Sequence, residues 1–247
     1  MKREMYGTVR RIEATHWWYV GRRRIVLDWV RRLTPAGRPR ILDLGCGTGF
    51  NLEHLPQLFP CDVVGADISG DALEFCRTRR LSALVRADAA YPPFRDGSFD
   101  VILALDVIEH VRDDERALAA LGRLLRPGGR LVIFTPAFQF LWSEHDRVSH
   151  HFRRYTSGEL GGKLAAAGFA VEKLSYANTF LFPLVWAGRL ALRAARNGAA
   201  ADAESALPPD WMNGLLAGIF SFEHRLLRRL DFPFGVSLLA IARRSGA

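Results

Sequence analysis

Hydrophobic and polar positions alternate along residues 40–135, where short apolar runs are separated by longer amphipathic segments. Several of those segments have the spacing of helices, for example Gly70–Arg80 and Asp113–Leu125. Strands that alternate with helices predict a mostly parallel sheet covered on both faces, so we expect a doubly wound α/β fold. The expected strands are residues 40–44, 63–67, 83–87, 99–105 and 130–135.

The first 33 residues carry an apolar stripe at approximately helical spacing, with arginines on the other faces. We expect this segment to be helical and to end at Thr34–Gly37. It contains the aromatic cluster His16–Tyr19. Those side chains either pack on the core or form part of a lid over a ligand.

The pattern becomes less regular after residue 135. A loop at Pro136–Ser149 precedes a helix whose expected cap is Thr156 or Ser157, and a sixth strand is expected at Phe169–Tyr176. Two apolar helical stretches, residues 179–196 and 209–230, are joined by a polar, alanine-rich linker at 197–207. A last apolar run, Gly235–Arg243, predicts one more strand.

The overall composition places few constraints on the function, but the net charge bears on the kind of partner. The net charge is +8, supplied mainly by scattered arginines without a basic tail, so nucleic acid, an anionic membrane surface and an acidic substrate all stay open. No run reaches the roughly 18 apolar residues of a membrane span, and residues 1–11 do not resemble a secretory signal. Cys46, Cys61 and Cys76 lack metal or redox spacing, which predicts reduced thiols in a cytoplasmic setting.

A glycine-rich turn follows the first expected strand, in the run Ile41–Phe50. Backbone amides can approach a ligand closely there, because glycine has no Cβ. Asp67 ends the next strand about 20 residues later, the offset at which nucleotide-binding units place a carboxylate on ribose. Asp67, Asp88 and the run Asp106–His110 should all lie at the same edge of the sheet. The simpler alternatives are that Asp43 caps the turn, Asp67 caps a helix and Asp88 is a solvated acid.

Five segments in this order resemble the motifs of class I S-adenosylmethionine-dependent methyltransferases. They are ILDLGCGTG, VVGAD, VRADA, SFDVILALDVIEHV and LLRPGGRLVIFTP, and the resemblance covers residues 40–176 and the last strand. It implies a Rossmann-like sheet whose last strand is an antiparallel edge. We expect one domain over residues 1–247, consisting of a helical lid (1–36), the core (37–176 and 233–247) and a helical cap insertion (177–232).

The resemblance also implies the cofactor, S-adenosylmethionine, its product S-adenosylhomocysteine, and the residues that hold them. It assigns the methionine end to Asp43, Gly45, Cys46 and Gly47, the ribose to Asp67, the adenine to Ile68, Asp88 and Ala89, and the sulfonium to Leu105.

Within this superfamily the chain is similar to the methyltransferase type 11 group and its ubiquinone-biosynthesis O-methyltransferases. Trp17–Trp18, an arginine at 23 or 24, and the loop from His145 to Leu160 carry that resemblance. It implies a cofactor-binding role for the arginine, which we assign to Arg24. The chain departs from the group in having Asp106 where glutamate is usual, and in a longer loop and insertion.

Methyl transfer to a hydroxyl requires a base near the carboxyl ends of the fourth and fifth strands. His110 and His145 are the expected catalytic residues, ahead of His150 and His151, because imidazole titrates near neutral pH. A divalent Mg²⁺ or Mn²⁺ on Asp106, Glu109, His110 and one loop histidine is the alternative that we do not favour. The adjacent Arg153–Arg154 run either clamps an anion or is solvated.

Apolar helices flanked by arginines in the insertion favour a small apolar or lipid-linked acceptor, methylated at oxygen. The protein is then cytoplasmic with peripheral contact to a membrane. A cap packed on its own neighbours and a homodimer contact are the alternatives for these helices. For the function, the alternatives are an RNA or protein methyltransferase and a non-catalytic cofactor-binding protein, although no nucleic-acid-binding module is recognisable.

Overall fold

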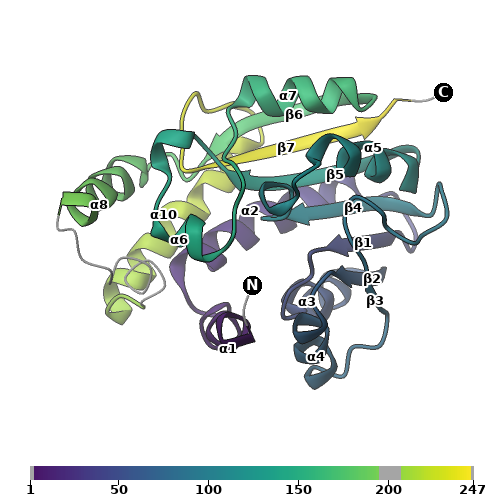
Figure 1. Ribbon diagram of the computed structural model, residues 1–247, viewed down its shortest axis with the longest axis horizontal. Helices are drawn as coiled ribbons and strands as arrows, with labels where there is room; N and C mark the ends of the chain where they lie inside the picture. Colours follow the sequence, from purple (N-terminus) through teal and green to yellow (C-terminus); the bar gives the residue numbers. More distant parts are fainter. Residues whose placement is uncertain (1–2, 195–206, 246–247) are drawn as a thin grey trace.

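A seven-stranded sheet forms the centre of the computed structural model, which describes residues 3–194 and 207–245 (Figure 1). Its order is β3-β2-β1-β4-β5-β7-β6. The strands are β1 (Arg40–Leu44), β2 (Asp62–Asp67), β3 (Leu84–Arg86), β4 (Phe99–Leu105), β5 (Leu125–Pro136), β6 (Phe169–Ala177) and β7 (Ser237–Arg244). The α-helices are α1 (Arg3–Ile12), α2 (Trp17–Leu33), α3 (Phe50–Leu58), α4 (Gly70–Thr78), α5 (Asp114–Leu124), α6 (Glu144–Val148), α7 (Ser157–Ala166), α8 (Phe182–Ala194) and α10 (Asp210–Leu227).

Strands β1 to β5 pair in parallel, and β7 runs antiparallel to both of its neighbours. The doubly wound, mostly parallel sheet with an antiparallel last strand is therefore confirmed. The expectation that this strand lies at the edge is wrong, because β7 is inserted between β5 and β6. The sequence carried a signal of this: Leu238–Ala242 is continuously apolar, which is typical of a strand buried on both faces.

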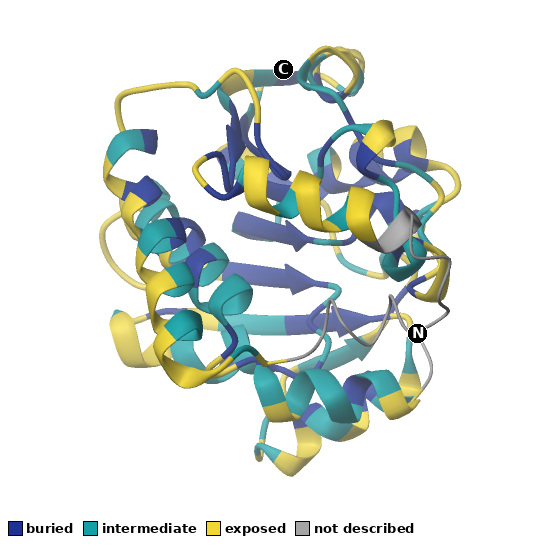
Figure 2. Cartoon of the chain, turned by 90° about the vertical axis from the view of Figure 1, so that its left-hand side faces the viewer, coloured by how far each residue is buried: buried dark blue, intermediate teal, exposed yellow. Residues whose placement is uncertain are grey.

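Strands β1, β4, β5 and β7 are buried over most of their length, and the dark blue arrows in Figure 2 mark such buried strands. On one face, α5 and α7 pack against the sheet through residues such as Leu121 and Leu164. On the other face, α2, α3 and α10 contribute residues such as Ile25, Leu55 and Phe220. The sheet thus separates two apolar clusters, and its carboxyl edge stays available for a ligand.

The N-terminal segment is not one helix, because Glu13 turns into the protein and interrupts it. Glu13 is buried and forms an ion pair with Arg79, while Thr48 in the glycine-rich turn donates to its other oxygen. The chain resumes a helix at α2, where the His16 ring accepts a hydrogen bond from the amide of Trp18 at 3.2 Å. The break lets α1 and α2 meet the glycine turn from different directions.

Two other boundaries differ from the sequence expectation. Strand β5 begins at Leu125 instead of residue 130, because Leu125 pairs with Phe99 across a bulge. The expected loop before Ser149 contains the short helix α6, in which Ser143 and Asp146 form a capping box. Thr156 caps α7 in the same way with Glu159, as predicted.

Helices α8 and α10 lie between β6 and β7 in the chain. Glu223 of α10 is fully buried and accepts hydrogen bonds from the amides of Asn178, Thr179 and Phe180 at 2.6, 2.7 and 2.9 Å. This contact fixes α10 to the segment that leads into α8. The predicted linker at 197–207 falls, except for its last residue, outside the described residues. Over residues 3–194 and 207–245, no helix combines the length and the apolar character needed to cross a membrane.

Candidate functional site

A cavity opens where β1 and β4 lie side by side, at the switch in strand order. In open α/β sheets this crevice beyond the carboxyl ends of the strands is where ligands bind. Two sides of the cavity come from different parts of the chain. The sheet and glycine turn contribute Asp43, Gly45, Cys46, Gly47, Thr48, Phe50, Asn51 and Leu105, and α1 and α2 contribute Val9, Tyr19, Arg22, Arg23, Val26 and Leu27, with Glu13 between them.

The glycine turn is held tightly against β2. The amides of Gly45 and Cys46 both donate to the carbonyl of Ala66, at 2.7 and 3.1 Å. Gly45 has a φ of +68°, and a Cβ at this position would lie 2.4 Å from the side chain of Val107. Only glycine therefore satisfies both the backbone conformation and the close packing at this point.

Two buried carboxyl groups flank the turn. The oxygens of Asp67 accept from the amides of Gly47 at 3.0 Å and Ser69 at 2.9 Å, so the acid links the glycine turn to the start of α4. Burial raises the pKa of Asp67 in spite of these bonds. Burial raises the pKa of Asp43 further, to about 7, and Asn51 donates to this carboxyl at 3.4 Å. A cationic ligand group beside Asp43 would favour its ionised form.

The residues assigned to adenine lie at the next strand ends. Ile68 is 62% exposed although it is apolar, and it directly follows Asp67. Asp88 is exposed and accepts from the amide of Ala90 at 2.8 Å, while Ala89 is buried. An open apolar side chain beside a carboxylate offers a stacking surface and a hydrogen-bond acceptor, and the roles assigned to these residues stay predictions.

Helix α2 supplies the other wall, but through different arginines than expected. Arg22 and Arg23 line the cavity, whereas Arg24 is exposed on the outer side of α2. Arg23 stacks over the ring of Phe50 at 4.2 Å, next to the glycine turn. The cofactor role assigned to Arg24 is therefore better placed on Arg23, the other arginine that the resemblance allowed. Tyr19 also lines the cavity, and burial raises its pKa to about 12.

Beyond Leu105, the end of β4 turns toward a polar cluster. Asp106 adopts a φ of +55°, a conformation that is uncommon outside glycine and that concentrates at functional sites. Its carboxylate forms an ion pair with Arg22 of α2. Glu109 is fully buried, and its Oε2 accepts from Thr135 Oγ1 at 2.9 Å. Burial raises the pKa of Glu109 well above its ordinary value, and within the described chain its Oε1 has no hydrogen-bond partner.

The two histidines expected to be catalytic lie at this cluster. Burial lowers the pKa of His110 to about 3, so this imidazole is neutral and a weak proton acceptor. His145 is on α6, and its Nε2 lies 3.4 Å from Ser149 Oγ. The rings of His110 and His145 both lie near His151, at centroid distances of 4.4 and 6.2 Å. The His151 ring thus lies where the loop packs against the segment that follows β4.

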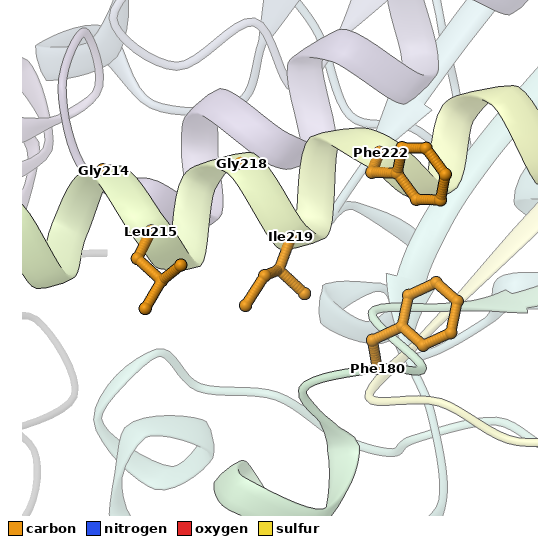
Figure 3. Close-up of a pocket in the computed structure, with 6 residues that line it drawn as sticks. All are labelled: Phe180, Gly214, Leu215, Gly218, Ile219 and Phe222. Atoms are coloured by element: carbon orange, nitrogen blue, oxygen red, sulfur yellow. The ribbon is translucent and has the colours of Figure 1, made fainter.

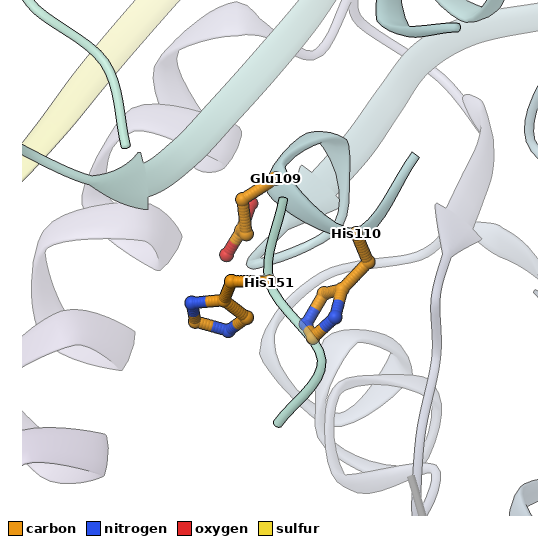
Figure 4. A group of neighbouring side chains, drawn as sticks. All are labelled: Glu109, His110 and His151. Atoms are coloured by element: carbon orange, nitrogen blue, oxygen red, sulfur yellow. The ribbon is translucent and has the colours of Figure 1, made fainter. Parts of the chain in front are cut away.

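Figure 4 shows Glu109, His110 and His151 converging from η1 (Ile108–His110) and the loop. One donor atom from each lies within 4.8 Å of the others, a spacing that would also suit a metal ion. Asp106 is not part of this group. Burial raises the pKa of Glu109 when no ion is bound, and the expectation of a metal-free site stays a prediction.

The loop contributes a buried network that the sequence reasoning did not anticipate. Asp146 is fully buried and accepts from His151 Nδ1 at 2.8 Å and from Arg154 at 2.8 Å on each oxygen. Arg153 pairs with Asp114 at 2.9 Å. Each arginine therefore binds a carboxylate of the protein itself: Arg154 is buried on Asp146, whereas Arg153 stays partly exposed.

The comparisons with known proteins agree with this geometry. Residues 42–133 match the family described as "Methyltransferase domain". This is the segment from β1 to β5 that carries the glycine turn, Asp67, Asp88 and the end of β4. The chain carries a class I S-adenosylmethionine-dependent methyltransferase domain. The fold agrees: a putative methyltransferase solved in complex with the Trm112 activator of Haloferax volcanii superimposes with a TM-score of 0.63, at 20% identity, over 97% of this chain and 95% of that one.

Curated relatives of this methyltransferase domain differ in the reactions that their names describe. O-methyltransferase cnsE of Penicillium expansum is 40% identical over 41% of this chain and 40% of its own length. A ubiquinone biosynthesis O-methyltransferase of Xanthomonas axonopodis pv. citri is 29% identical over 58% and 67%. The mouse tRNA (carboxymethyluridine(34)-5-O)-methyltransferase ALKBH8 is 34% identical over 54% and 19%. The chain spans less than half the length of the first curated relatives that it matches.

Proposed function

We propose that this protein transfers a methyl group from S-adenosylmethionine to an oxygen atom of a small apolar or lipid-linked acceptor. The observation that carries the proposal is the position of the polar cluster. Leu105 lines the cofactor cavity, and the chain continues from it through Asp106 to the group of Glu109, His110 and, from the loop, His151. Proton-accepting groups beside a methyl donor suit the deprotonation of a hydroxyl. Two of the relatives named above, one fungal and one bacterial, are O-methyltransferases.

The apolar character of the acceptor is inferred from a groove on α10. Leu215, Ile219 and Phe222 form one side, and Phe180 lies opposite them (Figure 3). The groove is open to solvent and has a volume of about 610 Å³. Its lining contains no charged side chain. An alkyl or prenyl tail would fit this surface without burying a polar group.

Contact with a membrane surface follows from what surrounds the groove. Apolar side chains are exposed over both helices, namely Leu184, Trp186 and Leu190 on α8 and Trp211, Leu215 and Phe222 on α10. Arg225 continues the same face of α10 three residues after Phe222, Arg229 follows in the turn after the helix, and both arginines are exposed. Helix α8 has no acidic residue, and on α10 only Asp210 is an exposed acid. An apolar face with cationic ends suits an anionic lipid surface.

Tritiated methyl transfer tests the function directly. Purified full-length protein would be incubated with S-adenosylmethionine labelled in the methyl group and a fractionated cell extract. We expect label in the organic-extractable fraction. Label confined to RNA or protein would contradict the small-molecule acceptor, and binding of cofactor without transfer to any fraction would favour the non-catalytic alternative.

RNA methylation is the second candidate, and one observation favours it. The domain is 34% identical over 137 residues to a relative named for tRNA methylation, and the net charge is +8. Positive charge attracts RNA without specifying it. The same labelling experiment separates the two candidates, because nuclease treatment releases label only from RNA.

A further inference from the structure

The His–Asp loop holds the imidazole of His151 next to Glu109 and His110, which follow the end of β4. His151 Nδ1 lies 2.8 Å from Asp146 Oδ1, and only 6% of the His151 side chain is exposed. Because a carboxylate can only accept, the hydrogen of a neutral His151 lies on Nδ1 and the lone pair on Nε2. The ring is therefore held in one tautomer, with its basic nitrogen directed away from Asp146.

The charge of Asp146 is already balanced within the protein. Arg154 donates to both of its oxygens at 2.8 Å, and the amide of Ser143 donates at 2.7 Å. Burial opposes ionisation, but the hydrogen bonds from His151 and Arg154 hold the pKa of Asp146 well below its ordinary range. Arg154 and the Ser143 amide therefore compensate the charge of Asp146, and its Oδ1 fixes the orientation of the His151 ring.

His151 faces charged or titratable groups from three elements. Asp146, Arg154 and His145 belong to its own loop region, Glu109 and His110 to η1, and Asp106 to the end of β4. Asp106 follows Leu105, which lines the cofactor cavity. When an acceptor hydroxyl lies next to the methyl donor at this edge of the sheet, the imidazole with a fixed orientation near it is that of His151. His110 is less suited, because its burial disfavours protonation and lowers its pKa.

We propose that His151 is the general base for the methyl transfer and that Asp146, held by Arg154, is its positioning residue. This rests on the proposed function. The cofactor supplies a methyl group activated by its sulfonium. The acceptor O–H bond breaks as its proton moves to His151 Nε2, and the oxygen forms the new bond to the methyl carbon. The sulfur–methyl electron pair stays on sulfur, which leaves S-adenosylhomocysteine, a methyl ether and an imidazolium that Asp146 stabilises.

The first test is the transfer rate of full-length variants into the organic-extractable fraction. His151→Gln keeps an N–H donor for Asp146 but has no base, and we expect a loss of about 10²- to 10⁴-fold with unchanged affinity for S-adenosylhomocysteine. In His151→Ala, added imidazole should restore at least part of the rate. The matched control is His150→Asn, because His150 is exposed at a φ of +59° that asparagine tolerates, and it should behave as wild type.

His151→Gln with more than half of the wild-type rate would overturn the proposal. A second set of results would also overturn it: EDTA abolishes the wild-type rate, Mg²⁺ restores it, and imidazole does not rescue His151→Ala. A metal would then activate the hydroxyl. If the wild-type protein transfers no methyl group at all, the proposed function fails. In that case ¹⁵N NMR of the histidines still tests which ring nitrogen of His151 carries the hydrogen. A neutral Nδ1–H tautomer that is lost in Asp146→Asn supports the arrangement, and an Nε2–H tautomer in wild type contradicts it.

Discussion

Arg22 on α2 and Asp106 at the end of β4 form an ion pair between two half-buried side chains. Arg22 also lines the cofactor cavity and lies over the ring of Trp18 at 4.7 Å. One guanidinium therefore joins the N-terminal helices to the edge of the sheet where we expect the acceptor. In the proposed function, this pair connects the donor side of the site with the acceptor side.

Removal of Arg22 should weaken cofactor binding. In Arg22→Ala, Asp106 loses its partner and α2 loses one attachment to the sheet, so we expect the Kd for S-adenosylhomocysteine to rise about tenfold, equivalent to about 1.4 kcal/mol. Isothermal titration calorimetry measures this. Arg31→Ala removes an exposed arginine from the same helix and serves as the control. Equal affinities in both variants would show that α2 does not close on the cofactor.

Asp67 should contribute more to the affinity than any exposed acid on β2. Its oxygens hold Gly47 and Ser69 and are assigned to the ribose hydroxyls. Asp67→Asn replaces one acceptor with a donor, and we expect affinity for S-adenosylmethionine to fall about 10- to 100-fold. Asp62→Asn, at the exposed start of the same strand, should leave it unchanged. If Asp67→Asn retains its affinity for S-adenosylmethionine, Asp67 does not bind the ribose hydroxyls.

The cofactor-free protein should lose stability as pH rises from about 4 to 7. Burial raises the pKa of Asp43 to about 7, whereas an unfolded chain releases this proton near pH 3.9. The folded chain thus holds one more proton in this window, and the free energy of unfolding falls by about 1.4 kcal/mol per pH unit for this group. Above pH 7 both states are ionised and the contribution has been lost.

Urea unfolding at a series of pH values checks this dependence. Asp43→Asn should reduce the slope of the free energy of unfolding against pH. It should not abolish this slope, because burial also raises the pKa of Glu223 to about 7. Asp62→Asn, whose carboxyl is exposed, should leave the slope as in wild type. A slope in Asp43→Asn identical to that of wild type would contradict the raised pKa of Asp43.

The groove on α10 should determine membrane binding. In the double variant Leu215→Ser with Phe222→Ser, we expect sedimentation with phosphatidylglycerol vesicles to fall at least tenfold, since each change removes on the order of 1 kcal/mol of apolar transfer. Leu58→Ser on α3 removes an equally exposed leucine and should have no effect. Sedimentation with neutral phosphatidylcholine vesicles tests whether the arginines contribute to binding, which should then be weaker than to phosphatidylglycerol. Unchanged binding by the double variant, or self-association in place of vesicle binding, would contradict a lipid surface.

The residues that meet at the carboxyl edge of the sheet were predictable, because they are close in sequence to strand ends. Asp43, Gly45 and Asp67 follow directly from the apolar runs and the glycine turn, and the sheet brings them to one edge without further information. Arg24 shows the limit of this reasoning. Adjacent residues on a helix point about 100° apart, and only the packing of α2 decides that Arg22 and Arg23 line the cavity while Arg24 is exposed.

The acceptor side was harder to predict, because its geometry depends on an irregular loop. The residues Asp146, His151 and Arg154 are visible in the sequence, but nothing in their spacing says that the aspartate is buried between the other two. A run of arginines reads as a surface feature, and Arg154 is buried because Asp146 compensates its charge. His110 was expected to be basic from its residue type, and burial changes that.

The position of β7 has a consequence for biosynthesis. β5 ends at Pro136 and its sheet neighbour begins at Ser237, so the two long strands β5 and β6 keep unpaired edges while the intervening chain is made. Each open edge is a template for pairing with another chain. The nascent protein can assemble β1 to β5, but the sheet closes only when its last strand leaves the ribosome and inserts between two strands already present. Translation arrest before residue 237 would therefore leave an aggregation-prone intermediate.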